Sequence, residues 1–298
     1  MIAQQRSTNF ANSHLVRRFL PGSTSVLIVK FFRLCFPASA LVRRLARLIA
    51  IFRGIKEHFA YKLSGESRRH RNFHHRYNGE RCFIIGTGPS LNSTDLEALS
   101  SEYTFAVKSY IFTGINRFNL SPTFFCWSDR GTLIKSLPLL VSLIPEELIC
   151  FFPFSVRDRV NRFLGSRKQN IFFIRDIYEW NVQLGLFSAD PSDLLHCSGS
   201  VIIDYCIPLA IYMGFKQIYL LGCDHCNRPD GVRHFDGRRA PLSGISTPWD
   251  VVTEGYRVVA GYAAEHGIEI YNATRGGELE VFPRVSLEDV LLDQSVLR

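Results

Sequence analysis

The sequence predicts an α/β fold over residues 81–298: a Rossmann-like, doubly wound and mostly parallel sheet with helices on both faces. One observation is that short, continuous apolar runs alternate with helical patterns. Strands buried on both faces read as such runs, and their alternation with helices is typical of this fold class. The other is that the first run leads directly into a glycine-rich loop, where sheets of this kind bind ligands.

Seven apolar runs predict strands, at 82–85, 104–107, 123–127, 148–152, 171–174, 217–221 and 268–271. Helical patterns between them predict helices at 93–100, 131–143, 155–164, 199–213 and 252–266. Two long segments, 181–197 and 225–250, follow neither pattern. Loops of that length in a compact domain are usually functional, so we expect a mobile loop at 225–250.

The positive charge of the chain is concentrated near its N-terminus. The 298 residues carry a formal net charge of +8. Residues 1–81 hold 16 Lys or Arg and three acidic residues, a net of +13, which leaves −5 for the rest. We therefore predict a basic segment over 1–80, followed by the catalytic domain over 81–298.

This basic segment is predicted to be an amphipathic, peripheral membrane element. Apolar residues recur at helical spacing over 41–55 with arginines between them, and Lys30 and Arg33 interrupt the only earlier apolar stretch. We therefore expect neither a signal peptide nor a spanning helix. Such a helix can lie on an anionic membrane surface, here the cytoplasmic face. It could instead pack on the domain.

Other partners follow less well from the sequence. The basic cluster 68–76 could bind nucleic acid, but no nucleic-acid module accompanies it, so we expect none as a partner. Eight cysteines lie scattered, mostly in apolar runs, which favours a reducing compartment. Only Cys223 and Cys226 have metal-like spacing, and without a second pair we expect no metal site.

The loop after the first strand is the strongest candidate site. It reads Gly86-Thr87-Gly88-Pro89-Ser90. Glycines let backbone amides approach a phosphate, and a following helix would present its positive end. The loop lacks the lysine of a P-loop and the third glycine of a dinucleotide fingerprint. We interpret it as a phosphate-binding loop of another kind; a plain tight turn is the alternative.

Polar residues follow other predicted strands and could complete that site. Lys108, Asp129 and Asp224 lie within three residues after the second, third and sixth strands. The helix expected at 199–213 begins with Ser198-Gly199-Ser200, whose hydroxyls and amides could bind a second phosphate or a carboxylate.

The loop 225–250 carries cationic side chains that could close over an anion. Arg233 and Arg238 could neutralise a leaving phosphate. His234 is a candidate general acid or base because histidine titrates near neutral pH, although an exposed loop histidine is an equally good interpretation.

Taken together, FIIGTGPSL, HCSGSVIIDYCIPLAIYMGFKQIYLLGCD, HFD and GYAAEHGIEIYNAT give the chain a family resemblance. Over about 82–290 it resembles the bacterial sialyltransferase superfold and its relatives. These relatives include the domain found in motility-associated flagellin glycosyltransferases and the 6-hydroxymethylpterin diphosphokinase-like family. The resemblance implies a CMP-sugar site, with Gly86 to Ser90 at the nucleotide, Ser198 and Gly199 near the donor's phosphate or carboxylate, and Asp224 at the nucleoside.

The chain departs from those sialyltransferases at several positions. Thr87 and Lys108 stand where the resemblance implies asparagines. Cys226 and either Arg233 or His234 stand where it implies two tyrosines that assist the leaving phosphate. The position of the implied catalytic histidine falls near Asp250. The base is therefore Asp250 or His234, or it is missing.

The sequence thus predicts a glycosyltransferase that needs no cofactor. It would transfer a sugar, with a nonulosonic acid as one candidate, from a nucleotide donor to a surface-polysaccharide or lipid-linked acceptor. One alternative is a pterin diphosphokinase using ATP and Mg²⁺, for which Asp129 and Asp224 are the candidate metal ligands. Another is a non-catalytic nucleotide-binding protein. The oligomeric state is left open.

Overall fold

The computed structural model describes residues 56, 58–176, 187–192, 199–226, 231–238 and 249–292. The chain divides into two units, Met1–Ala60 and Tyr61–Arg298, and the second contains the sheet. The predicted amphipathic helix over 41–55 and Ser198 lie outside the described residues. Within the described part, no helix has the length and apolarity that crossing a membrane requires.

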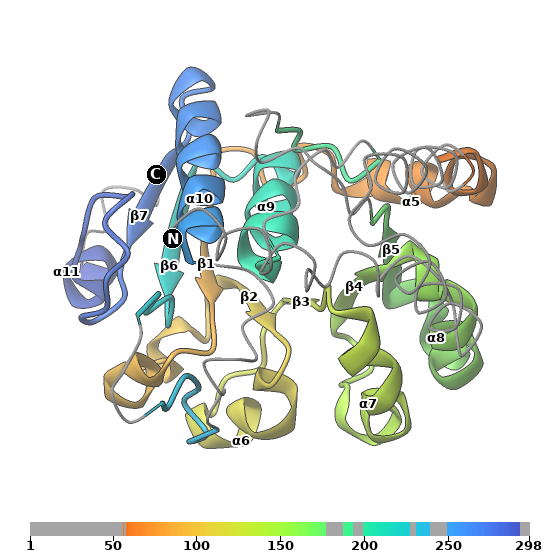
Figure 1. Ribbon diagram of the computed structural model, residues 1–298, viewed down its shortest axis with the longest axis horizontal. Coiled ribbons are helices and arrows are strands. Elements are labelled where there is room, and N and C mark those ends of the chain that lie inside the picture. Colours follow the sequence, from red (N-terminus) through yellow and green to blue (C-terminus); the bar gives the residue numbers. More distant parts are fainter. Residues whose placement is uncertain are drawn as a thin grey trace, which may run out of the picture. The chain divides into compact units, whose positions relative to one another are not determined.

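All seven predicted strands form one parallel sheet in the order β5-β4-β3-β2-β1-β6-β7 (Figure 1). Their bounds differ from the prediction by at most one residue: β1 Arg81–Ile85, β2 Tyr103–Val107, β3 Phe124–Cys126, β4 Ile149–Pro153, β5 Ile171–Ile174, β6 Gln217–Leu221 and β7 Glu269–Asn272. The strands β2 to β5 extend the sheet to one side of β1. The chain then returns to place β6 on the other side, so the topological switch point lies between β1 and β6.

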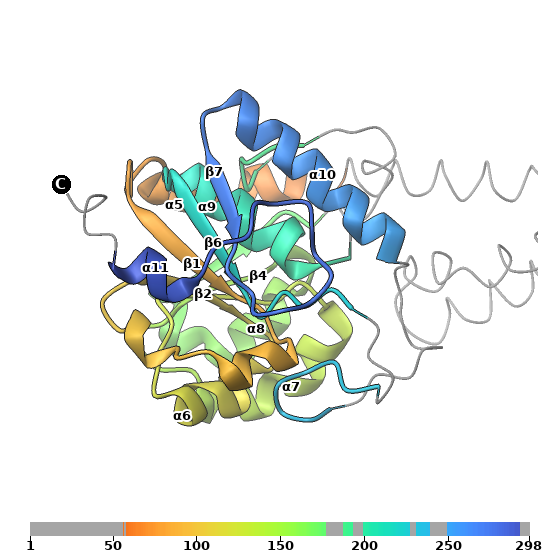
Figure 2. The ribbon, with the colours of Figure 1, turned by 90° about the vertical axis from the view of Figure 1, so that its left-hand side faces the viewer.

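Helices cover both faces of the sheet, as predicted (Figure 1). α7 (Arg130–Leu143) and α8 (Arg157–Leu164) pack on one face, and α9 (Ile207–Met213) and α10 (Trp249–Glu265) on the other. The turned view of Figure 2 shows α9 and α10 on one side of the strands and α7 on the other. Successive side chains of each strand point to opposite faces of the sheet. In β4, Phe151 packs with α9 and α10, whereas Cys150 and Phe152 pack with α7 and α8. The remaining helices are short: α5 Glu66–His70, α6 Ile115–Phe118 and α11 Leu287–Leu292.

The predicted helix at 93–100 is wrong. The chain forms only 3₁₀ turns there, at Pro89–Ser93 and Glu97–Leu99. The Ser93 and Thr94 hydroxyls both donate to the carbonyl oxygen of Ser90, at 2.9 and 3.0 Å. Such local bonds from short polar side chains compete with helix formation. The helix expected at 199–213 also differs, because a π-helical turn, Ile202–Cys206, precedes α9.

The stretch 61–80, which the sequence assigns to the basic segment, packs on the sheet. Its Tyr61, Phe73 and Tyr77 side chains are buried. α5 lies along the edge strand β5, where the backbone amide of Phe173 donates to the Glu66 carboxylate and a ring nitrogen of His70 lies 2.9 Å from the Phe173 carbonyl oxygen. These side chains satisfy main-chain groups that an edge strand otherwise leaves unpaired.

Candidate functional site at the β1–β6 switch point

The loops that follow β1 and β6 touch each other through their glycines. The Gly86 amide donates to the Leu221 carbonyl at 2.7 Å, and the Gly88 amide donates to the Gly222 carbonyl at 2.8 Å. A Cβ on Gly86 would lie 2.4 Å from the Gly222 oxygen, and one on Gly88 would lie 1.8 Å from Asp224 Oδ2. The two glycines of the GTGPS loop are therefore required for this contact between loops.

Asp224 joins three loops at the switch point. Its carboxylate is buried and accepts from the Ser90 amide at 3.1 Å and from the Ser90 hydroxyl at 2.6 Å. Its main-chain carbonyl accepts from the Glu278 amide at 2.8 Å, in the loop that follows β7. Asp224, which the resemblance places at the nucleoside, thus holds the GTGPS loop in place.

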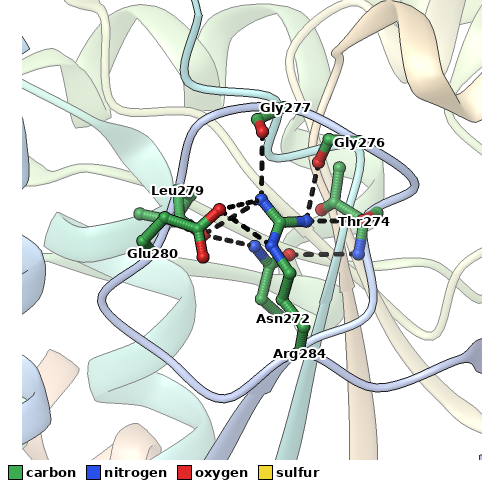
Figure 3. A network of polar contacts seen from close by, with 7 residues as sticks. All are labelled: Asn272, Thr274, Gly276, Gly277, Leu279, Glu280 and Arg284. Atoms are coloured by element: carbon green, nitrogen blue, oxygen red, sulfur yellow. Dashed lines mark hydrogen bonds and ion pairs between the residues drawn. The ribbon is translucent and has the colours of Figure 1, made fainter.

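Arg284 organises the loop after β7 (Figure 3). Its guanidinium donates to the carbonyl oxygens of Thr274, Gly276, Gly277 and Leu279 and pairs with the Glu280 carboxylate. Gly277 packs directly on Asp224, whose carbonyl oxygen would lie 2.5 Å from an added Cβ. Arg284 therefore fixes the conformation of the loop that packs against Asp224.

The middle of the predicted mobile loop is anchored to the GTGPS loop. The Phe235 amide donates to the Thr87 carbonyl at 2.8 Å, and His234 Nδ1 lies 2.9 Å from Thr87 Oγ1. The Asn92 side chain donates to the Phe235 carbonyl at 3.1 Å. The Phe235 ring is buried and packs against Phe118. The structure thus brings His234 to the GTGPS loop, as a joint site of the two segments requires.

Cations surround His234. Burial lowers the pKa of this half-buried histidine below its usual 6.5, and the positive charges of Arg238, Lys108 and Arg233 lower it further, against the opposing effect of Asp236. The imidazole is therefore neutral at neutral pH, and a neutral imidazole can accept a proton. The same cations make the surroundings of the loop attractive to a phosphate.

The start of α10 lies beside this segment. The Arg233 guanidinium stacks over the Trp249 ring, 5.6 Å from its centroid, and the His225 ring packs on the same tryptophan at 4.4 Å. Asp250, the other candidate base, follows Trp249 in the first turn of α10 and is exposed. Both candidate bases therefore come from segments that meet at Trp249.

The other predicted ligands hold helix ends within the fold. Asp129 caps α7: its Oδ1 accepts from the amides of Gly131 and Thr132 at 2.9 and 3.2 Å. The Gly199 amide donates to the Asp204 carboxylate at 3.0 Å, so it already has an anionic partner inside the protein. Burial raises the pKa of Tyr256, and the neighbouring Ser200 side chain opposes that effect.

Polar groups after β3, β4 and β5 gather into one cluster. Arg130 forms a 2.7 Å ion pair with Asp176, which also accepts from the amide and hydroxyl of Ser155. Burial raises the pKa of Asp176, and Arg130 opposes that effect. The residues that follow these strands thus meet at one rim of the sheet and stabilise each other there.

Sequence reasoning missed several residues that build the site. Asn92 and Phe235 fix the segment 231–238, and Glu278 and Arg284 support Asp224. The HFD motif contains Phe235, so an apolar residue inside a basic loop was a usable signal. Nothing local marks Arg284, because its partners are main-chain carbonyls.

Comparisons with known proteins agree with the predicted resemblance. No curated protein matches the chain. Two matching solved structures are of the sialyltransferase CstII from Campylobacter jejuni. One, with the substrate analogue cytidine-5'-monophosphate, is 14% identical, covers 70% of this chain and 86% of that one, and has a TM-score of 0.45. The other, with CMP-3FNeuAc, is 15% identical with the same coverage and a TM-score of 0.41.

These structural similarities are too low to assign an activity. The family comparison is stronger, because the model described as "6-hydroxymethylpterin diphosphokinase MptE-like" matches residues 58–230. That range spans more than half of the chain, from the segment before α5 to the exit of β6. The protein therefore belongs to the MptE-like family.

Proposed function

We propose that this protein is a transferase that binds the phosphate of a nucleotide-activated donor at the switch point between β1 and β6. The reaction that the site supports best is transfer of a sugar from a nucleotide-sugar donor to a hydroxyl of a surface-polysaccharide or lipid-linked acceptor. The observation that carries the proposal is the bond between His234 and Thr87. It holds a neutral histidine, with Lys108, Arg233 and Arg238 around it, at the GTGPS loop.

The chemistry follows from that arrangement. In glycosyl transfer the bond between sugar and phosphate breaks, and the phosphate leaves with the electron pair. A new bond forms between the sugar carbon and the acceptor oxygen, whose proton must go to a base. Cations held near the leaving phosphate stabilise its developing charge, and a neutral histidine can take the proton. Lys108, Arg233 and Arg238 are proposed for the first task and His234 for the second.

Asp250 remains the second candidate for the base. It is exposed beside Trp249, on which Arg233 stacks. His234→Asn and Asp250→Asn variants separate the two in a donor-hydrolysis assay. We expect the His234 change to reduce turnover by about 100-fold or more, which is typical of a lost general base, and the Asp250 change to matter less. Full activity in both variants would remove both candidates.

Pyrophosphoryl transfer from ATP to a hydroxymethylpterin is the second candidate function, and the description of the matching family favours it. That reaction needs Mg²⁺ held between phosphates. The donor set does not fit: Asp224 uses both carboxylate oxygens to hold Ser90, and Asp129 caps α7. We therefore assign no step to Mg²⁺.

Thermal unfolding in the presence of CMP, UDP, GDP or ATP, each with and without Mg²⁺, tests the proposal. A pyrimidine nucleotide should raise Tm without the metal, and Lys108→Ala should abolish most of that rise. Lys135→Ala, which removes an exposed lysine on α7, is the matched control and should leave it unchanged. A rise seen only with ATP and Mg²⁺ would favour the kinase, and no rise with any nucleotide would contradict both functions.

Peripheral association of residues 1–80 with an anionic membrane is part of the same proposal. A lipid-linked acceptor lies at a membrane, and the basic residues of this segment suit anionic headgroups. A variant lacking 1–60, the first unit, should pellet less with anionic vesicles than the full chain does. Equal pelleting would argue against a role for that segment.

A further inference from the structure

Six exposed side chains at the β5 end of the sheet combine positive charge with apolar surface. We call them the β5-end surface: Lys62, Leu63, Arg68, Arg159, Arg162 and Phe163. Leu63 is 87% exposed and Phe163 is 42% exposed, so each presents apolar surface to the surroundings beside the cations.

The elements that carry these residues are joined at this end of the sheet (Figure 1). The Tyr61 ring packs edge-on against Phe154, directly before α8, with centroids 5.1 Å apart. Arg69 of α5 donates to the carbonyl of Gln169, in the 3₁₀ segment Gly165–Asn170 that follows α8. The β5-end surface is therefore built from α8 and the chain around α5, which share contacts.

The α8 part of this surface lies on one side of the helix. Arg159, Arg162 and Phe163 are spaced by three and four residues and so share a face, while Val160 and Leu164 are buried against the sheet. Most of the α8 charge is positive: its one acidic residue, Asp158, is paired with Arg157 at 3.4 Å.

The α5 part also lacks a free negative charge. Glu66 is buried, and its carboxylate is engaged by Arg69 and by the backbone amide of Phe173. Lys62 and Arg68 are exposed on either side of it. Cations around protruding apolar side chains match the interface of an anionic bilayer, where headgroups attract the charges and the acyl boundary accepts the apolar groups.

We propose that the β5-end surface rests on an anionic membrane, with Leu63 and Phe163 entering the headgroup region. A nucleic acid would use the same cations, but it is bound mainly by phosphate contacts and by stacking on aromatic rings, so a membrane accounts better for the exposed leucine. The inference extends the membrane contact proposed for residues 1–80, to which Lys62, Leu63 and Arg68 belong, and it does not rest on the transferase reaction. It adds α8 to that contact and turns the β5 edge toward lipid, at the opposite end of the sheet from β7.

Co-sedimentation of the full chain with vesicles tests this surface. The vesicles contain phosphatidylcholine with about 30% phosphatidylserine, a strongly anionic surface. Since each basic group near such a surface contributes to binding, Arg159→Glu combined with Arg162→Glu should weaken binding by about 30-fold or more, because losing the two positive charges alone accounts for that factor. Phe163→Ser should weaken binding at every salt concentration without changing its salt dependence, because it removes no charge.

The matched control combines Arg257→Glu with Arg275→Glu, which changes the net charge equally at exposed sites, 62% and 52% accessible, away from β5. It should bind as the unchanged chain does, and circular dichroism should show all variants folded. If both double variants weaken vesicle binding equally, net charge alone governs binding, and the proposal is overturned. It is also overturned if the variant with Arg159→Glu and Arg162→Glu binds vesicles as strongly as the unchanged chain, or if that variant loses only its binding to a duplex oligonucleotide. None of these outcomes depends on nucleotide binding.

Discussion

Ser90 gives both its backbone amide and its hydroxyl to the carboxylate of Asp224, although 134 positions separate the two residues. Asp224→Asn removes the charge and turns an amide NH₂ toward one of these donors. Hydrogen bonds to a charged group contribute about 1.5–3 kcal/mol, so we expect a loss of that size in the free energy of unfolding. Urea denaturation measures it. Asp95→Asn, at an exposed aspartate, is the control and should change stability little.

Gly88 should not tolerate a side chain. An added Cβ would lie 1.8 Å from Asp224 Oδ2 and 2.7 Å from the Gly222 carbonyl oxygen, so Gly88→Ala must separate the β1 and β6 loops. We expect a loss of about 1–3 kcal/mol in stability, as for overpacked sites, together with loss of the Tm rise caused by nucleotide.

Gly261→Ala is the matched control for that change. Gly261 lies inside α10, and an added Cβ would meet no atom within 4 Å beyond the neighbouring residues and backbone of its own helix, so alanine there should stabilise the protein by about 0.5–1 kcal/mol. Similar stability changes in the two variants would contradict the close approach at Gly88.

Arg284 should act through main-chain carbonyls rather than through its ion pair. Arg284→Lys keeps the charge but cannot reach four carbonyl oxygens at once. We expect stability to fall by about 1–3 kcal/mol and the loop after β7 to be cut faster by protease. Glu280→Gln removes only an exposed ion pair and should cost less than about 1 kcal/mol. Equal losses of stability in the two variants would mean that Arg284 acts through its ion pair with Glu280.

The strands could be predicted because burial on both faces leaves a continuous apolar run, of which QIYLL is the clearest example. A helix, α9, precedes β6, and a strand that follows a crossover helix lies parallel to the rest of the sheet. The switch point lies between β1 and β6 because the strand order reverses there. The helix expected at 93–100 failed for a local reason: the Ser93 and Thr94 hydroxyls bond back to Ser90.

The sequence indicates which residues belong to the site, but it does not indicate which of them touch each other. Gly88 and Asp224 both stand out in the sequence, yet only the sheet register brings the exits of β1 and β6 together. Thr87 and His234 are 147 positions apart, and their bond depends on Phe235 being buried between α6 and the β1 loop. Pairings of this kind depend on tertiary packing, which no local pattern records.

His70 should make the protein sensitive to acid. Burial lowers the pKa of His70 from 6.5 to about 4, so between those values the unfolded chain binds a proton that the folded chain does not. Stability therefore falls as pH falls through this window, by about 2 kcal/mol between pH 7 and pH 5. His70→Gln keeps a donor for the Phe173 carbonyl but cannot titrate, so its stability should decline less over the same range. Urea denaturation at both pH values measures the difference, with exposed His74→Gln as the control. If His70→Gln and the unchanged chain lose equal stability, the buried histidine is not the acid-sensitive group.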